Sequence, residues 1–124
     1  MARVARRNSV IAVLAVAGVA LSSCGTGGAI ADARTSCKSV ERAIALQKKS
    51  DAPNISASQR IVLRQNAMST LLKATPSAAA ATSIDGSWNA LMTTINEAER
   101  VPLENLVPSL TRLCQVAQST SPYL

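Results

Sequence analysis

An apolar stripe near the middle of the chain gives the strongest indication of its fold. Ile84, Trp88, Leu91, Ile95 and Ala98 follow one another at intervals of four, three, four and three residues. This spacing places all five side chains on one face of an α-helix, which must then pack against other elements. No stretch of the sequence sustains the alternation with a period of two that is typical of a β-strand. The sequence therefore predicts an all-α protein.

Three further segments have the same helical spacing. The first covers about residues 36–49, the second follows a capping box formed by Ser56 and Gln59, and the last begins near Leu103. The residues expected to face the core are Cys37, Val40, Ile44 and Gln47 in the first segment, Ile61, Met68, Leu71 and Leu72 in the second, and Leu103, Leu106, Val107, Leu110, Leu113, Cys114 and Ala117 in the last. Short connections favour antiparallel neighbours, so we expect a small antiparallel bundle of about four helices, held together by one disulfide.

Prolines and capping residues predict where these helices begin and end. Thr75-Pro76 should stop the second helix, and Thr82 with Asp85 repeats the capping-box spacing that would start the third. Two points stay open at this level. The alanine-rich residues 77–81 are either helical or a packed linker, and Pro108 either kinks the last helix or splits it into a short turn and a main helix.

The N-terminus has the composition of an export signal. Residues 1–8 carry three arginines and no acidic residue, and residues 10–21 form an unbroken apolar run. A membrane-spanning helix needs roughly 20 such residues, so this run is too short to be one. A basic segment, a short apolar segment and a small-residue exit are typical of a secretory signal peptide. The Arg6-Arg7 pair resembles a twin-arginine signal, but the polar Asn8 and Ser9 that follow favour ordinary Sec export.

The apolar run ends at Leu21-Ser22-Ser23-Cys24, which resembles the lipobox of bacterial lipoproteins. The resemblance covers residues 1–24. It implies transfer of a diacylglyceryl group to the Cys24 thiol and cleavage before Cys24. Because two acyl chains anchor a protein stably where one does not, we expect the exported chain to be held on the outer face of the cell membrane through Cys24. The alternative is cleavage after Ala29-Ile30-Ala31, which would release a chain that begins at Asp32 and lacks Cys24.

This interpretation divides the chain into four parts. Residues 1–23 are the signal peptide, residues 24–34 the lipidated N-terminus and a flexible tether, residues 35–120 the helical bundle domain, and residues 121–124 a short tail. The tether is expected because three of residues 25–28 are glycine, which favours a flexible chain.

Cys37 and Cys114 are the two cysteines that remain once Cys24 carries lipid. In an oxidising compartment such a pair most often forms a disulfide. In a four-helix antiparallel bundle the start of the first helix and the end of the last lie at the same end, so the expected fold allows this bond. A chain without histidine offers too few ligands for a tetrahedral zinc site, and no Cys-x-x-Cys motif suggests a redox site.

The composition argues against catalysis and against nucleic-acid binding. The chain has no His, no Phe, one Trp and one Tyr, so it lacks histidine general bases and the aromatic residues on which bases stack. It also lacks a Gly-rich phosphate loop and a nucleophile elbow, and we expect neither enzymatic activity nor a cofactor. The net charge of +6 overstates how basic the mature chain is, because three of the 13 basic residues belong to the signal peptide while the 7 acidic residues all remain.

Two functions remain: a non-catalytic binding or accessory module of the cell envelope, and a carrier of a small apolar ligand or lipid in the bundle interior. Trp88 is expected to fill the centre of the core, with ligand binding as the alternative. Lys48, Lys49 and Arg100 lie in or beside connections expected to face away from the membrane, which makes them candidate contacts for an envelope protein. An apolar cavity on the order of several hundred Å³ would favour the carrier, and a filled core with an exposed apolar patch would favour the binding module.

Overall fold

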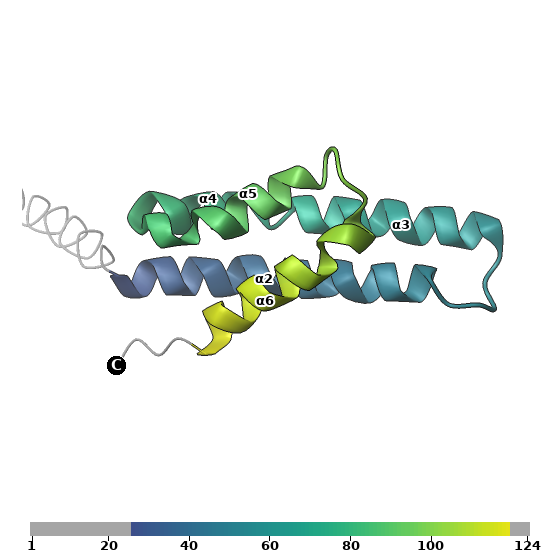
Figure 1. Ribbon diagram of the computed structural model, residues 1–124, viewed down its shortest axis with the longest axis horizontal. Helices are drawn as coiled ribbons and strands as arrows, with labels where there is room; N and C mark the ends of the chain where they lie inside the picture. Colours follow the sequence, from purple (N-terminus) through teal and green to yellow (C-terminus); the bar gives the residue numbers. More distant parts are fainter. Residues whose placement is uncertain (1–25, 120–124) are drawn as a thin grey trace, which may run out of the picture.

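The computed structural model describes residues 26–119, which form an all-α bundle. Its elements are α2 (Thr26–Ser50), α3 (Ala57–Leu72), α4 (Thr75–Ile84), the 3₁₀ helix η2 (Gly86–Trp88), α5 (Asn89–Glu97) and α6 (Leu103–Ser119). These elements form four antiparallel helical segments: α2 is the first, α3 and α4 together the second, η2 and α5 the third, and α6 the fourth (Figure 1). The predicted fold class is confirmed, and residues 26–119 contain no strand. The proposed signal peptide at 1–23, the lipidation site Cys24 and the tail at 121–124 lie outside the described residues.

Helix α2 is the element against which the others pack. It is 25 residues long, which corresponds to about 37 Å, and it contacts α3, α4 and α6. The predicted tether is wrong for residues 26–34, which are helical, and the helix expected from about residue 36 begins at Thr26. The physical reason is burial: Ala29 and Ala33 are fully buried and continue the stripe of Val40 toward the N-terminus. This packing outweighs the low helix propensity of the glycines.

Small side chains fill much of the core. Residues 77–81 belong to helix α4 and do not form a linker. Both buried residues of this helix, Ala78 and Ala81, are alanines. Alanine lets helix axes approach closely, and larger residues fill the wider spaces between the helical segments. The buried alanines are Ala29, Ala33, Ala43, Ala67, Ala74, Ala78, Ala81, Ala98 and Ala117, and the larger fully buried apolar residues are Val40, Leu71, Leu91, Ile95 and Leu110.

The break between α3 and α4 is caused by Pro76. Proline has no N–H to donate to the carbonyl of Leu72 four residues earlier, so α3 ends there, close to the predicted stop. In the first turn of α4 the missing N–H breaks no helical bond, so the same proline can begin the next helix. The fully buried Ser36 hydroxyl of α2 donates a hydrogen bond to the carbonyl of Ala74 over 3.0 Å, which ties the break to α2. Ser36 therefore makes its contact from within α2 and does not mark the start of a helix.

The face that α3 turns toward the core differs from the predicted one. Leu71 and Ala67 are fully buried, and Met68 packs against the core. Ile61 and Leu72, both expected inside, are 58% and 38% exposed. The helix is rotated so that Ala67, a small residue, lies against the bundle, because this allows a closer approach than the branched Ile61 would.

The predicted third helix is divided by a short 3₁₀ turn. Thr82 does not form a capping box with Asp85, because its hydroxyl donates to the carbonyl of Ala78 within α4. Asp85 instead caps η2: its carboxylate accepts the backbone N–H of Ser87 over 3.0 Å, and this bond lowers the pKa of Asp85. Ile84, expected on the inner stripe, is 48% exposed at the end of α4, whereas the four later residues of the stripe are buried.

Helix α6 is continuous from Leu103 to Ser119, although Pro108 lies inside it. Pro108 has no N–H to donate to the backbone carbonyl of Glu104, and both residues are exposed. Water can satisfy that carbonyl, which lowers the cost of the proline. Pro108 therefore does not split the helix.

Candidate functional site

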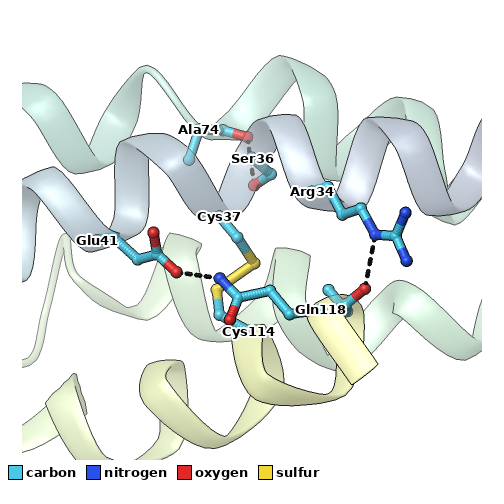
Figure 2. Close-up of a disulfide and its surroundings, with 8 residues drawn as sticks. Arg34, Ser36, Cys37, Glu41, Ala74, Cys114 and Gln118 are labelled. Atoms are coloured by element: carbon cyan, nitrogen blue, oxygen red, sulfur yellow. Dashed lines mark hydrogen bonds between the residues drawn. A yellow bond between two sulfur atoms is a disulfide. The ribbon is translucent and has the colours of Figure 1, made fainter. Parts of the chain in front are cut away.

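A disulfide between Cys37 and Cys114 joins α2 to α6 in the interior of the bundle (Figure 2). The two Cα atoms are 5.5 Å apart, and both residues are buried. The predicted pairing is confirmed, but its position differs from the expected one. Because α2 begins at Thr26, Cys37 is the twelfth residue of its helix and not near the start. The last turn of α6 therefore lies beside the first half of α2.

Polar contacts flank the disulfide (Figure 2). Arg34 Nε donates to the carbonyl of Ala117 over 2.9 Å, and the side-chain amide of Gln118 donates to the carboxylate of Glu41. The Arg34 contact satisfies a carbonyl in the last turn of α6, where a cation is favoured by the helix dipole. These bonds hold the C-terminal end of α6 in place along α2.

A groove of about 370 Å³ lies between α2 and α6 beside the disulfide. It is lined by Glu41, Ile44, Ala45 and Lys48 of α2 and by Thr111, Cys114, Gln115 and Gln118 of α6. Cys114 is bonded to Cys37, and Glu41 is engaged by Gln118, so the lining presents no free thiol and no carboxylate paired with a base. Such a groove can contact a polar chain through side chains such as Lys48, Thr111 and Gln115. Within residues 26–119 no group of three or more His, Cys, Asp and Glu side chains could hold a metal ion.

Two more open grooves are lined by residues of α2, α3 and the connection between them. One, of about 330 Å³, is lined by Arg42, Ala45, Leu46, Lys49 and Thr70. The other, of about 430 Å³, is lined by Ile55, Ser58, Gln59, Val62 and Leu63. The lining combines apolar side chains with two cations and polar groups.

The structure does not bring the four predicted binding residues together. Trp88 is 7% exposed and fills the core as expected; its indole N–H has no hydrogen-bond partner among the described residues. Lys48 lines the groove beside α6, whereas the next residue, Lys49, lines a groove beside α3. Arg100 is exposed in the connection between α5 and α6. Figure 1 shows that this connection lies far from the one between α2 and α3.

Sequence reasoning missed Arg42, Val62 and Leu63 as groove residues. A signal for Arg42 was present, since Lys38, Arg42 and Lys49 share one helical face at intervals of four and seven. Val62 had no such signal. Its exposure, 53%, follows from the rotation of α3, which the pattern of apolar residues did not determine.

Comparison with protein-family models, with curated proteins and with solved structures found no match to this chain. Among residues 26–119, no helix combines the length and the apolar character needed to cross a bilayer.

Proposed function

We propose that the chain is an exported lipoprotein, anchored through Cys24 to the outer face of the cell membrane, that binds another protein of the cell envelope without catalysing a reaction. The observation that carries the anchor is the sequence Leu21-Ser22-Ser23-Cys24 after a basic and then an apolar segment. The disulfide supports export, because such bonds persist in oxidising compartments.

The structure of α2 also bears on where the precursor is cleaved. Cleavage after Ala31 would remove residues 26–31 from α2, including the fully buried Ala29. Cleavage before Cys24 leaves the whole helix intact. The packing of Ala29 therefore favours the lipobox over the alternative site.

A binding role has more support than a carrier role. The buried positions of the bundle are filled by alanine, leucine and other apolar side chains, and the grooves described above are open at the surface between helices. The α3 residues Ile61 and Val62 are more than half exposed. A packed interior with apolar side chains on its surface is the arrangement expected of a protein that binds a partner.

The anchor is tested by the intact mass of the chain in the membrane fraction. We expect a mature chain that begins at Cys24 and carries acyl groups, and we expect Cys24→Ser to lose both the acylation and stable membrane association, because the lipid is the only anchor proposed. A Cys37→Ser/Cys114→Ser variant is the matched control for the loss of cysteine and should stay acylated. An unmodified chain that begins at Asp32 would overturn the lipoprotein assignment.

The binding role is tested with photo-crosslinking residues placed in the lipidated chain in its native cells. Gln65 on α3, Arg100 in the connection between α5 and α6, and Gln115 on α6 are exposed positions on three different elements. We expect a specific adduct with another envelope protein from at least one side. Native mass spectrometry of the purified domain provides the contrast with the carrier function. A co-purified apolar molecule without any protein adduct would favour the carrier.

A further inference from the structure

We propose that the solvent-facing side of the α2–α3 pair binds an amphipathic helix of the partner protein, with acidic residues on both sides of its apolar stripe. The inference rests on the proposed binding function and adds the surface and the chemistry of the partner. We call this surface the hairpin face; it consists of Lys38, Arg42, Ala45, Leu46 and Lys49 of α2, Ile55 in the connection, and Val62, Leu63, Thr70 and Lys73 of α3 and its C-terminal end.

Helical spacing places these residues on a common face. On α2, the exposed residues Lys38, Arg42, Ala45 and Lys49 are separated by four, three and four positions, so they lie in one row. On α3, Leu63 and Thr70 are seven residues apart and Val62 and Lys73 eleven, which also places each pair on one side. The two grooves of about 330 and 430 Å³ are lined by residues of this face, and neither lining includes a residue of α5 or α6.

The hairpin face is cationic, and its charges are not neutralised within the bundle. Among the described residues, Lys38, Arg42, Lys49 and Lys73 make no ion pair. The two basic residues within α3 are engaged: Arg60 donates to the carbonyl of Ala52, and Arg64 lies 3.6 Å from the carboxylate of Asp51. Lys48 of α2 lies outside the hairpin face and lines the groove beside α6.

The acidic residues of the two helices and their connection point elsewhere. Helix α3 contains none. Asp32 shares a stripe of α2 with Ser36 and Ala43, which are buried, and Glu41 is held by Gln118 of α6. Asp51 is paired with Arg64, whose side chain lines a separate groove with Pro102 and Leu103 on the side of α6. A surface with four unpaired cations and no acid selects a negatively charged partner.

The shape of the surface favours a helix as the partner. The groove of about 330 Å³ is lined by both antiparallel helices and can accept the side-chain ridge of a third helix. Apolar side chains line both grooves, with Leu46 in this one and Val62 and Leu63 in the one between α3 and the connection. The row from Lys38 to Lys49 extends about 17 Å, which matches about three turns of a bound helix. Acidic residues on the flanks of that helix would then face the cations on both sides of the seam.

The same features argue against two other occupants. A second copy of the chain, related by a two-fold axis through this face, would oppose cation to cation. A lipid surface is contacted best by faces that carry Trp, Phe or exposed Leu side chains. The hairpin face has no aromatic residue, and its leucines, Leu46 and Leu63, are only partly exposed.

The proposal is tested by placing a photo-crosslinking residue at Val62 in the full lipidated chain in its native cells. Val116 on α6 is the matched control, since it is also a valine and is 51% exposed against 53% for Val62. We expect an adduct from position 62 and none from position 116. Mass spectrometry should map the adduct to a partner segment with an apolar stripe of helical period and acidic residues on both sides.

Charge reversal supplies the second measurement. In Arg42→Glu/Lys49→Glu, the yield of the Val62 adduct should fall at least ten-fold, and so should the affinity of the purified chain for a synthetic peptide of the mapped segment. Arg100→Glu/Arg112→Glu changes the net charge equally at exposed positions outside the hairpin face and should leave both unchanged. Affinity of the unaltered chain for the peptide should weaken as salt rises from 0.1 to 0.5 M, because screening reduces the attraction. Circular dichroism and thermal melting verify that both variants fold.

Each alternative outcome has a distinct meaning. Crosslinking of Val62 to a second copy, to a segment without acidic residues, or to lipid alone would overturn the proposal. So would charge-dependent binding to phosphatidylcholine–phosphatidylglycerol vesicles at 3:1 without a protein adduct. Adducts from Gln65, Arg100 or Gln115 in the absence of one from Val62 would overturn the hairpin face and leave the binding function standing. Absence of protein adducts from every position would overturn both.

Discussion

Replacement of both Cys37 and Cys114 by serine is expected to lower the free energy of unfolding by about 4 to 5 kcal/mol. The bond closes a loop with a sequence separation of 77, and its loss restores to the unfolded chain the entropy that this closure removes. Small domains have total stabilities of roughly 5–15 kcal/mol, so the loss is a large share of the whole. The two serine hydroxyls would also be buried, since the cysteines are 1% and 3% exposed.

Urea denaturation followed by circular dichroism measures this loss. The unaltered chain in excess reductant should unfold at nearly the same urea concentration as the double serine variant, because both lack the bond. Cys24→Ser, which removes the cysteine outside the disulfide, should unfold like the unaltered chain. A double variant with an unchanged midpoint would show that the disulfide does not contribute to stability.

The adjacent leucines of α3 provide the second large effect. Leu71→Ala should reduce the free energy of unfolding by about 2 to 5 kcal/mol, because Leu71 is fully buried and its truncation leaves a cavity. Leu72→Ala removes the same atoms from a side chain that is 38% exposed, and we expect a loss below about 1 kcal/mol.

This pair also tests the rotation of α3. Both leucines were expected to face the core from the spacing of apolar residues, so two equal losses in urea denaturation would restore that expectation and contradict the structure. A large loss for Leu71 alone would confirm that Ala67 and Leu71, and not Ile61 and Leu72, form the buried face.

The fold class could be predicted from the spacing of apolar residues, and the disulfide from the number of cysteines. The spacing of Trp88, Leu91 and Ile95 fits a helix and not a strand. With Cys24 assigned to the lipobox, Cys37 and Cys114 are the two cysteines that remain to form a bond. Neither inference required the orientation of any helix to be known.

The start of α2 and the rotation of α3 could not be predicted, because tertiary packing decided them. Glycines at positions 25, 27 and 28 suggest a flexible segment by local propensity, and only the burial of Ala29 and Ala33 against other helices outweighs it. In α3 the apolar residues are too numerous to define one face, so the contact made by the small Ala67 decides which of them are buried.

The candidate site was predicted less well for the same reason. Lys48 and Lys49 are neighbours in sequence, but on a helix adjacent residues point about 100° apart, and here they line grooves on different sides of α2. Arg42 and Lys49, seven residues apart, line the same groove. Grouping the cations by helical spacing instead of proximity in sequence would have identified them.

The position of the disulfide determines how the fold responds to a pulling force. Tension applied between the N-terminal end of α2 and the C-terminal end of α6 passes directly through the bond between Cys37 and Cys114. Helices α3, α4 and α5 lie within the closed loop, so they bear no load and cannot be extended. Only the residues before Cys37 and after Cys114 can lengthen, which leaves most of the bundle intact while the ends are stretched.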